Sequence, residues 1–102
     1  MQLSKVLSAL AEPTRLSAMR LLWDGDEHCV CELMDQLGAT QSRMSRHMAV
    51  LKAAGLVLDR RDAQWVRYRR NAGLKPAVAK AVSAIVRAAD ALEEPISTRS
   101  AA

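Results

Sequence analysis

Two cysteines separated by a single residue, Cys29 and Cys31, are the side chains of this 102-residue chain best suited to chemistry. They are its only cysteines, and they lie just before a segment rich in serine and arginine. Residues two apart in a helix point about 200° away from each other, so one buried face cannot hold both. Closely spaced thiols bind soft atoms or become oxidised. The pair therefore predicts a chemical sensor, and two inert half-buried thiols are the plainer alternative.

Basic charge is concentrated in one stretch of the chain. The formal net charge is +4, yet residues 1–39 carry more acidic than basic side chains. Residues 40–70 carry only two carboxylates beside a set of basic side chains, namely Arg43, Arg46, Lys52, Arg60, Arg61, Arg67, Arg69 and Arg70. Such clustering indicates a polyanionic partner. It is not laid out as one amphipathic basic helix, which disfavours a membrane surface.

Hydrophobic periodicity predicts a mostly α-helical fold with one β-hairpin. The expected helices cover residues 3–10, 13–23, 30–37, 40–54 and a last segment from 76 until Pro95 ends it. Between the fourth and last helices, residues 56–58 and 65–70 are expected to be strands joined by a turn over 59–64. Residues 1–95 are expected to form one domain and 96–102 a flexible tail.

A short turn at Gly38-Ala39-Thr40 joins the third and fourth helices, which predicts a helix-turn-helix. The first turns of such a second helix reach base edges in the major groove of DNA. The candidate DNA-binding residues there are Gln41, Ser42, Arg43, Ser45, Arg46 and His47. On the basic hairpin, or wing, they are Arg60, Arg61, Arg67 and Arg69. The alternative is that these are ordinary solvated charges.

The last helix carries an apolar seam with a 3.5-residue period, at Val78, Val82, Ile85, Ala89 and Leu92. Such a seam is typical of a helix that pairs with another helix. A chain of this size buries only about 60–65% of its unfolded surface, so a dimer would relieve its marginal core. Double-stranded DNA and a second copy of the chain are thus the expected partners.

Other classes of protein are disfavoured. The N-terminus lacks a basic cluster followed by a long apolar run, which argues against a secretory signal and favours a reducing cytoplasm. No stretch approaches the roughly 18 apolar residues of a membrane span. Neither a glycine-rich phosphate loop nor a nucleophile–histidine motif is present, so an enzyme is not expected.

Three motifs together resemble one family. The opening Leu10-Ala11-Glu12-Pro13-Thr14-Arg15-Leu16, the pair in Cys29-Val30-Cys31-Glu32-Leu33, and residues 40–51 with the following Gly55-Leu56-Val57 are similar to the ArsR/SmtB winged-helix repressors, in order and spacing over residues 3–92. The resemblance implies a homodimeric repressor that needs no resident cofactor and leaves its operator when trivalent arsenic or antimony binds Cys29 and Cys31. It also implies that the first and last helices form the dimer contact, which adds Leu3, Val6 and Leu7.

The chain departs from this family pattern at two places. Met34 stands where a third cysteine is frequent, so a site with three thiolates does not carry over. The last helix has Asp90, Glu93 and Glu94 but no histidine, which argues against the zinc site of other members. Two thiols suit arsenite, antimonite or a monosubstituted organoarsenical, whereas zinc, cadmium or lead need three or four ligands. His28 is a candidate for one of those.

The helical spacing leads to one mechanistic expectation. If Cys29 and Cys31 both lay within regular helix, their sulfurs could not reach one atom, so binding should require the first turn of residues 30–37 to unwind. Thiol oxidation remains the rival form of sensing, although an internal disulfide between residues two apart is expected to be strained. A disulfide between two chains is the other form that oxidation can take.

Overall fold

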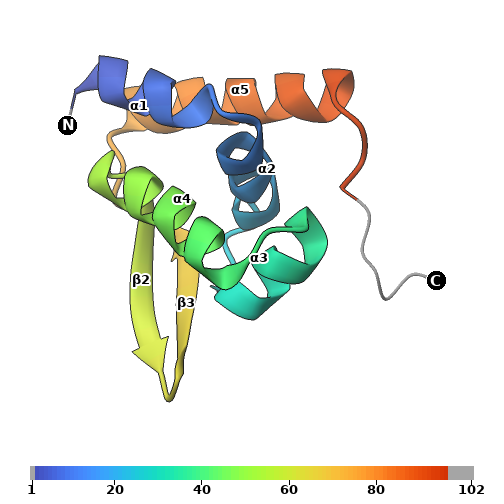
Figure 1. The fold of residues 1–102 in the computed structure, drawn as a ribbon. Coiled ribbons are helices and arrows are strands. Elements are labelled where there is room, and N and C mark those ends of the chain that lie inside the picture. Colours follow the sequence, from blue (N-terminus) through green and yellow to red (C-terminus); the bar gives the residue numbers. More distant parts are fainter. Residues whose placement is uncertain (1, 97–102) are drawn as a thin grey trace.

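The computed structural model describes residues 2–96, which form five helices and three strands (Figure 1). In chain order these are α1 (Leu3–Leu10), α2 (Pro13–Leu22), β1 (His28–Cys29), α3 (Val30–Leu37), α4 (Gln41–Ala53), β2 (Val57–Asp62), β3 (Trp65–Arg70) and α5 (Pro76–Leu92). The order of the helices and the hairpin confirms the mostly α winged helix-turn-helix expected from the sequence. The expected tail, residues 96–102, lies outside the described residues except for Ile96.

Local capping explains where the central helices begin and end. The Glu12 carboxylate accepts a hydrogen bond from the backbone N–H of Arg15 at 2.9 Å, next to Pro13 in the first turn of α2. Thr40 caps α4 by accepting from the backbone N–H of Arg43 at 3.3 Å. Gly38 ends α3 with φ of 67°, a left-handed conformation that glycine adopts without strain. The short turn expected between α3 and α4 is thereby confirmed.

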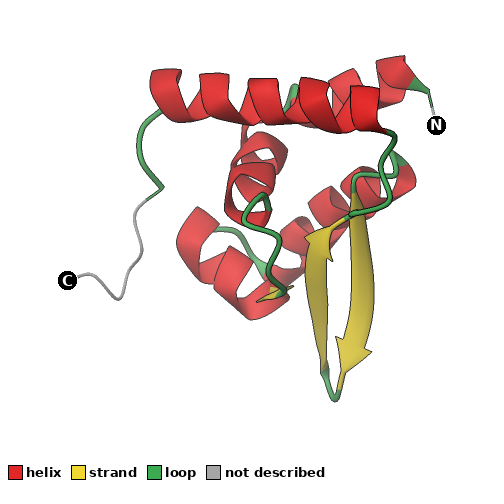
Figure 2. Ribbon diagram, turned by 180° about the vertical axis from the view of Figure 1, so that it is seen from behind, coloured by secondary structure: helices red, strands yellow, loops and turns green. Residues whose placement is uncertain are grey.

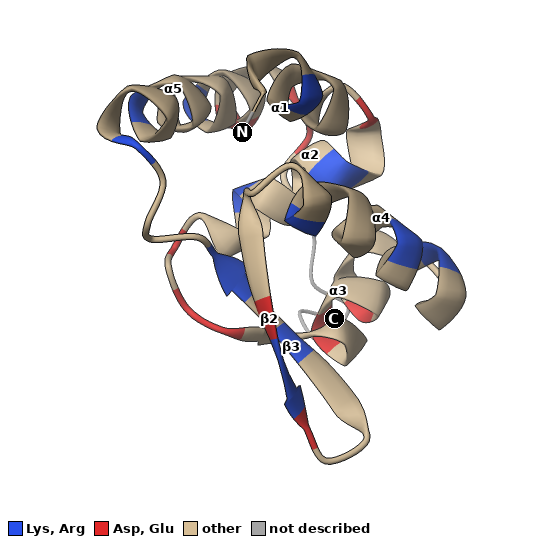
Figure 3. Cartoon of the chain, turned by 90° about the vertical axis from the view of Figure 1, so that its left-hand side faces the viewer, with Lys and Arg blue, Asp and Glu red and all other residues tan. Residues whose placement is uncertain are grey.

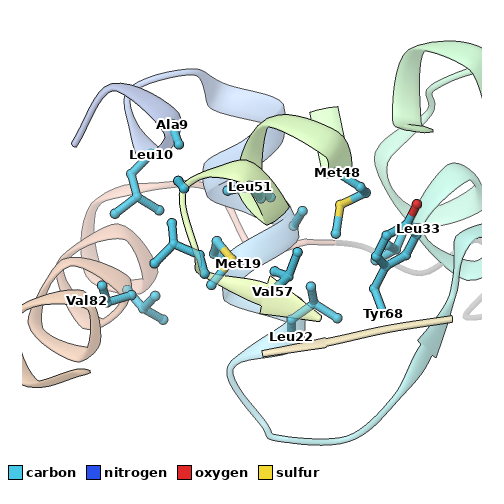
Figure 4. Packing of buried hydrophobic residues seen from close by; sticks show 14 of the residues in the cluster. Ala9, Leu10, Met19, Leu22, Leu33, Met48, Leu51, Val57, Tyr68 and Val82 are labelled. Atoms are coloured by element: carbon cyan, nitrogen blue, oxygen red, sulfur yellow. The ribbon is translucent and has the colours of Figure 1, made fainter. Parts of the chain in front are cut away.

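Helix α2 lies at the centre of an almost entirely aliphatic core (Figure 4). Met19 and Leu22 of α2 are completely buried, as are Met44, Met48 and Leu51 on the inner face of α4. Tyr68 of β3 is the one aromatic residue among the buried side chains of residues 2–96. Two polar contacts also join α2 to α5: Arg20 Nε donates to Asp90 Oδ1 at 2.7 Å, and Trp23 Nε1 donates to Ser83 Oγ at 2.9 Å.

The three strands form an antiparallel sheet in the order β1-β3-β2. The hairpin is longer than expected, because β2 continues to Asp62 and the turn is only Ala63-Gln64. The prediction of a turn over residues 59–64 was therefore wrong. The charged side chains that suggested a loop instead form ion pairs from the sheet, including Lys52–Asp59 at 3.0 Å and Arg67–Asp62 at 2.7 Å. Strand β1 was not predicted at all.

The molecule has two structurally distinct ends. Helices α1 and α5 lie together at one end, and the β2–β3 wing projects from the opposite end (Figures 1 and 2). Helices α3 and α4 lie between them, with the start of α3 beside the small strand β1. None of the helices within residues 2–96 is long and apolar enough to cross a membrane.

Candidate thiol site and nucleic-acid interface

Cys29 lies outside the helix that carries Cys31. It ends β1 and is the N-cap of α3, with extended backbone at φ of −65° and ψ of 144°. The two Cα atoms are 5.1 Å apart, and the two sulfur atoms are joined as a disulfide. The expected need to unwind the first turn is therefore wrong, since the helix begins only at Val30 and leaves the Cys29 side chain able to reach Cys31.

The two sulfurs differ in their surroundings. Cys29 is buried, with 4% of its surface exposed, and belongs to the hydrophobic core, whereas Cys31 is exposed. A shallow hollow adjoins the exposed sulfur, lined by Cys31, Met34, Asp35, Gly38, Ala39 and Thr40. Met34 is only half-buried there, so it is not simply the core residue that the apolar stripe of α3 suggested. The hollow links the thiol pair to the turn before α4.

A reciprocal cap fixes the start of α3 around the same residues. The Cys29 sulfur accepts from the backbone N–H of Cys31 at 3.2 Å, and Glu32 Oε1 accepts from the backbone N–H of Cys29 at 3.4 Å. This is a capping box in which cysteine takes the place usually held by serine or threonine. The sulfur that would bind an effector is thus also a structural acceptor of the helix.

His28 connects the loop before β1 to the first turn of α3 through two carboxylates. Its Nδ1 lies 3.1 Å from Glu32 Oε2, and its Nε2 lies 3.0 Å from Asp24 Oδ2. Burial alone would lower the pKa of His28, but the hydrogen bonds with Glu32 and Asp24 outweigh it and raise the pKa above its ordinary value of 6.5. With both ring nitrogens facing carboxylates, the imidazolium form, which donates from both, fits the site best. We call Asp24, His28 and Glu32 the histidine clamp.

The thiol segment is paired directly with the wing. In the β1–β3 register, His28 faces Tyr68 and Cys29 faces Arg67. Just before β1, Glu27 accepts two hydrogen bonds from Arg60 of β2, at 2.7 and 2.8 Å. The hydrogen bond from Arg60 lowers the pKa of the Glu27 carboxyl. Sequence reasoning missed these links because they depend on a two-residue strand with no periodic signal.

The outer face of α4 carries most of the side chains predicted to contact DNA. Gln41, Ser42, Arg43 and Arg46 are exposed, and Ser45 is half-buried. Ser42 and Arg46 lie one turn apart, opposite the buried Met44 and Met48 of the same helix. Figure 3 shows the lysine and arginine positions along α4 and the wing. A row of polar and basic side chains at a helix start can reach bases and phosphates.

His47 does not share this face. Its Nδ1 lies 3.3 Å from Arg15 Nη1 and 3.6 Å from Glu12 Oε2, at the start of α2, and its side chain is 18% exposed. Arg15 in turn donates to the backbone carbonyl of Ala9 at 2.7 Å. His47, which was predicted to contact DNA or to pack at the edge of the helix-turn-helix, thus has its ring between α2 and α4.

The four wing arginines fall into two classes. Arg60 and Arg67 are held by carboxylates, through Glu27 and through Asp62, whereas Arg61 and Arg69 are exposed and form no ion pair within residues 2–96. The strand register puts Arg60, Arg67 and Arg69 on one face of the wing and Arg61 on the other. The wing therefore presents an unpaired arginine on each face, Arg69 on one and Arg61 on the other, together with two arginines whose charge is neutralised by carboxylates.

The residues predicted to form a dimer contact divide into exposed and buried ones. Leu3, Leu7 and Leu92 are exposed, at 61%, 50% and 85%. Val6, Val82 and Ala89 are instead buried in the chain's own core, so their assignment to a contact between chains is corrected. Val78 and Ile85 are half-buried at the boundary. The outward face of α5 is formed by the alanines that each precede a residue of the predicted seam by one position, namely Ala77, Ala81, Ala84, Ala88 and Ala91.

Within the part of the chain that the structure describes, no group of three or more His, Cys, Asp and Glu side chains could hold a metal ion. Both ring nitrogens of His28, the candidate third ligand, are already occupied by Asp24 and Glu32. Within residues 2–96, the candidate site therefore comprises the sulfurs of Cys29 and Cys31, with no third His, Cys, Asp or Glu ligand beside them.

Comparison with known proteins yields one family. The family described as "Bacterial regulatory protein, arsR family" matches residues 12–58. The arsenic resistance transcriptional regulator ArsR2 of Pseudomonas putida is 47% identical over 66 residues, which cover 65% of this chain and 57% of that protein. The arsenical resistance operon repressor of Escherichia coli is 43% identical over 65 residues, covering 64% and 56%. The matched region thus spans little more than half the length of these two relatives.

A solved structure extends the likeness to three dimensions. The solution structure of the homodimeric winged helix-turn-helix DNA-binding domain of a Mycobacterium bovis protein superimposes with a TM-score of 0.70. It is 30% identical in sequence, and the match covers 86% of this chain and 78% of that chain. Fold and sequence therefore point to the same group of proteins.

Proposed function

Because the chain belongs to the ArsR family of bacterial regulatory proteins, we propose that it is a homodimeric repressor that releases its operator when a trivalent arsenical bridges Cys29 and Cys31. The observation that carries this proposal is the closeness of the two sulfurs at the start of α3. In the reduced protein, only side-chain rotation is needed to bring both onto one arsenic atom. The relatives named for arsenic resistance support the choice of effector.

The reaction at the site is a condensation. Arsenite has three hydroxyl groups, and each thiol replaces one of them, so two As–S bonds form and two water molecules leave. The third position keeps a hydroxyl, or a carbon substituent in an organoarsenical, and the hollow beside Cys31 and Met34 offers it space. Arsenite and antimonite are neutral near pH 7, so the carboxylates of Glu27 and Glu32 do not oppose or favour their approach through charge.

Binding also displaces a helix cap. The Cys29 sulfur accepts from the Cys31 N–H, so an arsenic atom inserted between the two sulfurs moves this acceptor, and losing an N-cap altogether costs a helix about 1 kcal/mol. Two connections carry this change outward. Helix α3 leads into α4 through Gly38-Ala39-Thr40, and β1 is paired with β3 of the wing. A coupling of about 1–3 kcal/mol between effector and DNA is typical of such allostery.

DNA binding is assigned to the outer face of α4 and to the wing. Arg43 and Arg46 are the candidates for guanine, Gln41 for adenine, and Ser42 and Ser45 for phosphates, in line with general base-recognition geometry. Arg61 and Arg69 supply wing charge to the flanking backbone, joined by Arg60 and Arg67 when their carboxylates release them. A dimer would place two such faces on half-sites about one DNA turn apart.

The dimer contact is assigned to the exposed apolar surface of α1 and α5, which lie at the end of the molecule away from the wing (Figure 2). It comprises Leu3 and Leu7 of α1 together with Leu92 and the alanine row of α5. Alanine side chains allow two helix backbones to approach closely. The homodimeric Mycobacterium bovis domain supports the existence of a dimer.

The proposal is tested by operator binding of the reduced protein to the DNA upstream of its own coding sequence. Unrelated DNA should displace the operator poorly, and the affinity for the operator should fall steeply as the salt concentration rises. Arsenite, antimonite and phenylarsenite should each release the operator from the wild type but not from a Cys29→Ser/Cys31→Ser variant. Release that is unchanged in the double variant would remove the sensing assignment, and a lack of selective duplex binding would remove the repressor itself.

A further inference from the structure

The oxidised state of the thiol pair is compatible with the rest of the fold. The Cα separation of 5.1 Å falls inside the range of about 4.4–6.8 Å that disulfides require, and the two sulfurs are joined. The extended backbone of Cys29 makes this possible, because it frees the side chain from the helical direction that Cys31 follows. The same feature that suits the pair to arsenic therefore suits it to reversible oxidation.

Exposure gives the two cysteines different roles in such a reaction. Cys31 is exposed and lines an open hollow, so an oxidant in solution meets this sulfur first. Cys29 is buried and lies directly behind it, so it is placed to attack whatever Cys31 has become. The chain has no other cysteine, so no third thiol competes for the intermediate within one chain.

The DNA-reading elements are complete while the disulfide is present. Helix α3 still begins at Val30 with its capping box, Gly38 still ends it, and Thr40 still caps α4. The outer face of α4 remains exposed, with Arg43 and Arg46 directed away from the core. Oxidation of the pair thus leaves the helix-turn-helix assembled, whereas it consumes both sulfurs that an arsenical needs.

We propose that Cys29 and Cys31 form a reversible disulfide by exchange with a small disulfide such as oxidised glutathione, and that this oxidised form holds the operator but does not respond to arsenicals. The Cys31 thiolate attacks one sulfur of the small disulfide and releases one thiol, leaving a mixed disulfide on Cys31. The Cys29 thiolate then attacks the Cys31 sulfur, forms the internal bond and releases the second thiol. Two protein thiols are oxidised, one small disulfide is reduced to two thiols, and the protons pass through solvent.

The oxidised protein is expected to keep its operator because its helix-turn-helix is intact. The loss of the arsenical response rests on the proposed function, since it concerns the same two sulfurs. A cell under oxidative stress would then keep the regulated genes repressed even in the presence of arsenic. Reduction of the pair would restore sensing without new synthesis of the protein.

The experiment treats the full chain with oxidised glutathione, removes the reagent by gel filtration, and compares it with protein reduced by a phosphine that is likewise removed. Mass spectrometry should show a monomer lighter by two hydrogen atoms, with no free thiol. Its operator affinity should stay within about threefold of that of the reduced form. Phenylarsenite should release the reduced complex but leave the oxidised complex bound until the phosphine is added back.

Two single variants test the assigned roles. Cys29→Ser should stop at the mixed disulfide and keep one glutathione on Cys31. Cys31→Ser should react much more slowly, because only the buried thiol remains. Equal rates of modification in the two variants would contradict these roles.

The outcomes separate the two proposals. A disulfide between chains, a mixed disulfide that persists in the wild type, or loss of operator binding on oxidation would each overturn the present inference. If the reduced complex fails to respond to phenylarsenite, the proposed function fails, and the mass and operator measurements still decide whether the internal disulfide forms and is tolerated.

Discussion

Cys29 and Arg67 face each other across the antiparallel β1–β3 pair. One is the candidate effector ligand and the other belongs to the wing, so the thiol segment is part of the same sheet as the hairpin that would lie along DNA. Arg60, two strands away in the sheet order, reaches back to Glu27 just before β1. A change at the cysteines therefore has a path to the wing that does not pass through α4.

Arg46 is the first side chain to test on the DNA-reading face. Arg46→Ala should weaken operator binding by about 1–3 kcal/mol per half-site if the side chain reads a base, and should relax selectivity at that position. Fluorescence anisotropy with the upstream DNA measures the loss. Arg87→Ala removes the same charge from an exposed position on α5 and should change affinity less than twofold. Equal losses in both variants would show that only net charge matters.

Replacing Glu27 tests whether its ion pair with Arg60 keeps that arginine from contacting DNA. Glu27→Gln removes the carboxylate that accepts two hydrogen bonds from Arg60, so Arg60 becomes available to phosphate. Operator affinity should rise, and the salt dependence should steepen by about one unit per chain. Glu93→Gln, which removes the same charge beyond the end of α5, serves as the control. A fall in affinity for the Glu27 variant would contradict this account of the wing.

The histidine clamp predicts a pH dependence of stability. The pKa of His28 is raised in the folded chain, so its contribution is complete below the ordinary value of 6.5 and is lost as the pH rises through the folded value. Replacing it in His28→Gln should cost about 1 kcal/mol at pH 5.5, and the difference from wild type should shrink toward pH 8.5. Urea unfolding at fixed protein concentration measures this difference. A gap that grows with pH would contradict the clamp.

The alanine row of α5 predicts where a dimer is most vulnerable. Ala84→Glu places a charge at its centre, so sedimentation should report a species near the 11.2 kDa monomer, with an unchanged helical circular dichroism spectrum. Operator affinity should fall with it, because two half-sites are no longer bound together. Gln64→Glu adds the same charge at the turn of the wing and should leave the dimer intact. A dimeric Ala84→Glu variant would exclude this face.

Much of the fold could be predicted because the chain marks its helices clearly. Pro13 lies at the start of α2, Gly38 ends α3, and Thr40 caps α4, each by a local rule that depends on neighbouring residues alone. The buried face of α4 followed equally well from the spacing of Met44 and Met48. Each of these signals depends on residues that are only a few positions apart in the sequence.

The errors arose where tertiary contacts decide. Strand β1 has two residues and exists as a strand through its pairing with β3, so no periodicity marks it. The apolar seam of α5 was placed correctly on the helix but assigned to a partner, because spacing cannot tell a neighbouring helix from the chain's own core. The sequence does carry one local signal for this segment: Asp24, His28 and Glu32 are spaced four apart, and Cys29 and Glu32 have the spacing of a capping box.

The most direct test of the account is the release of the operator from phosphine-reduced protein during titration with phenylarsenite, followed by anisotropy. Wild type and Met34→Leu should release the DNA at about one arsenical per chain, because two thiols suffice and the thioether is not a ligand. Cys29→Ser, Cys31→Ser and the double variant should stay bound. Release from the double variant, or loss of release in Met34→Leu alone, would contradict a sensor built from the Cys29 and Cys31 thiols.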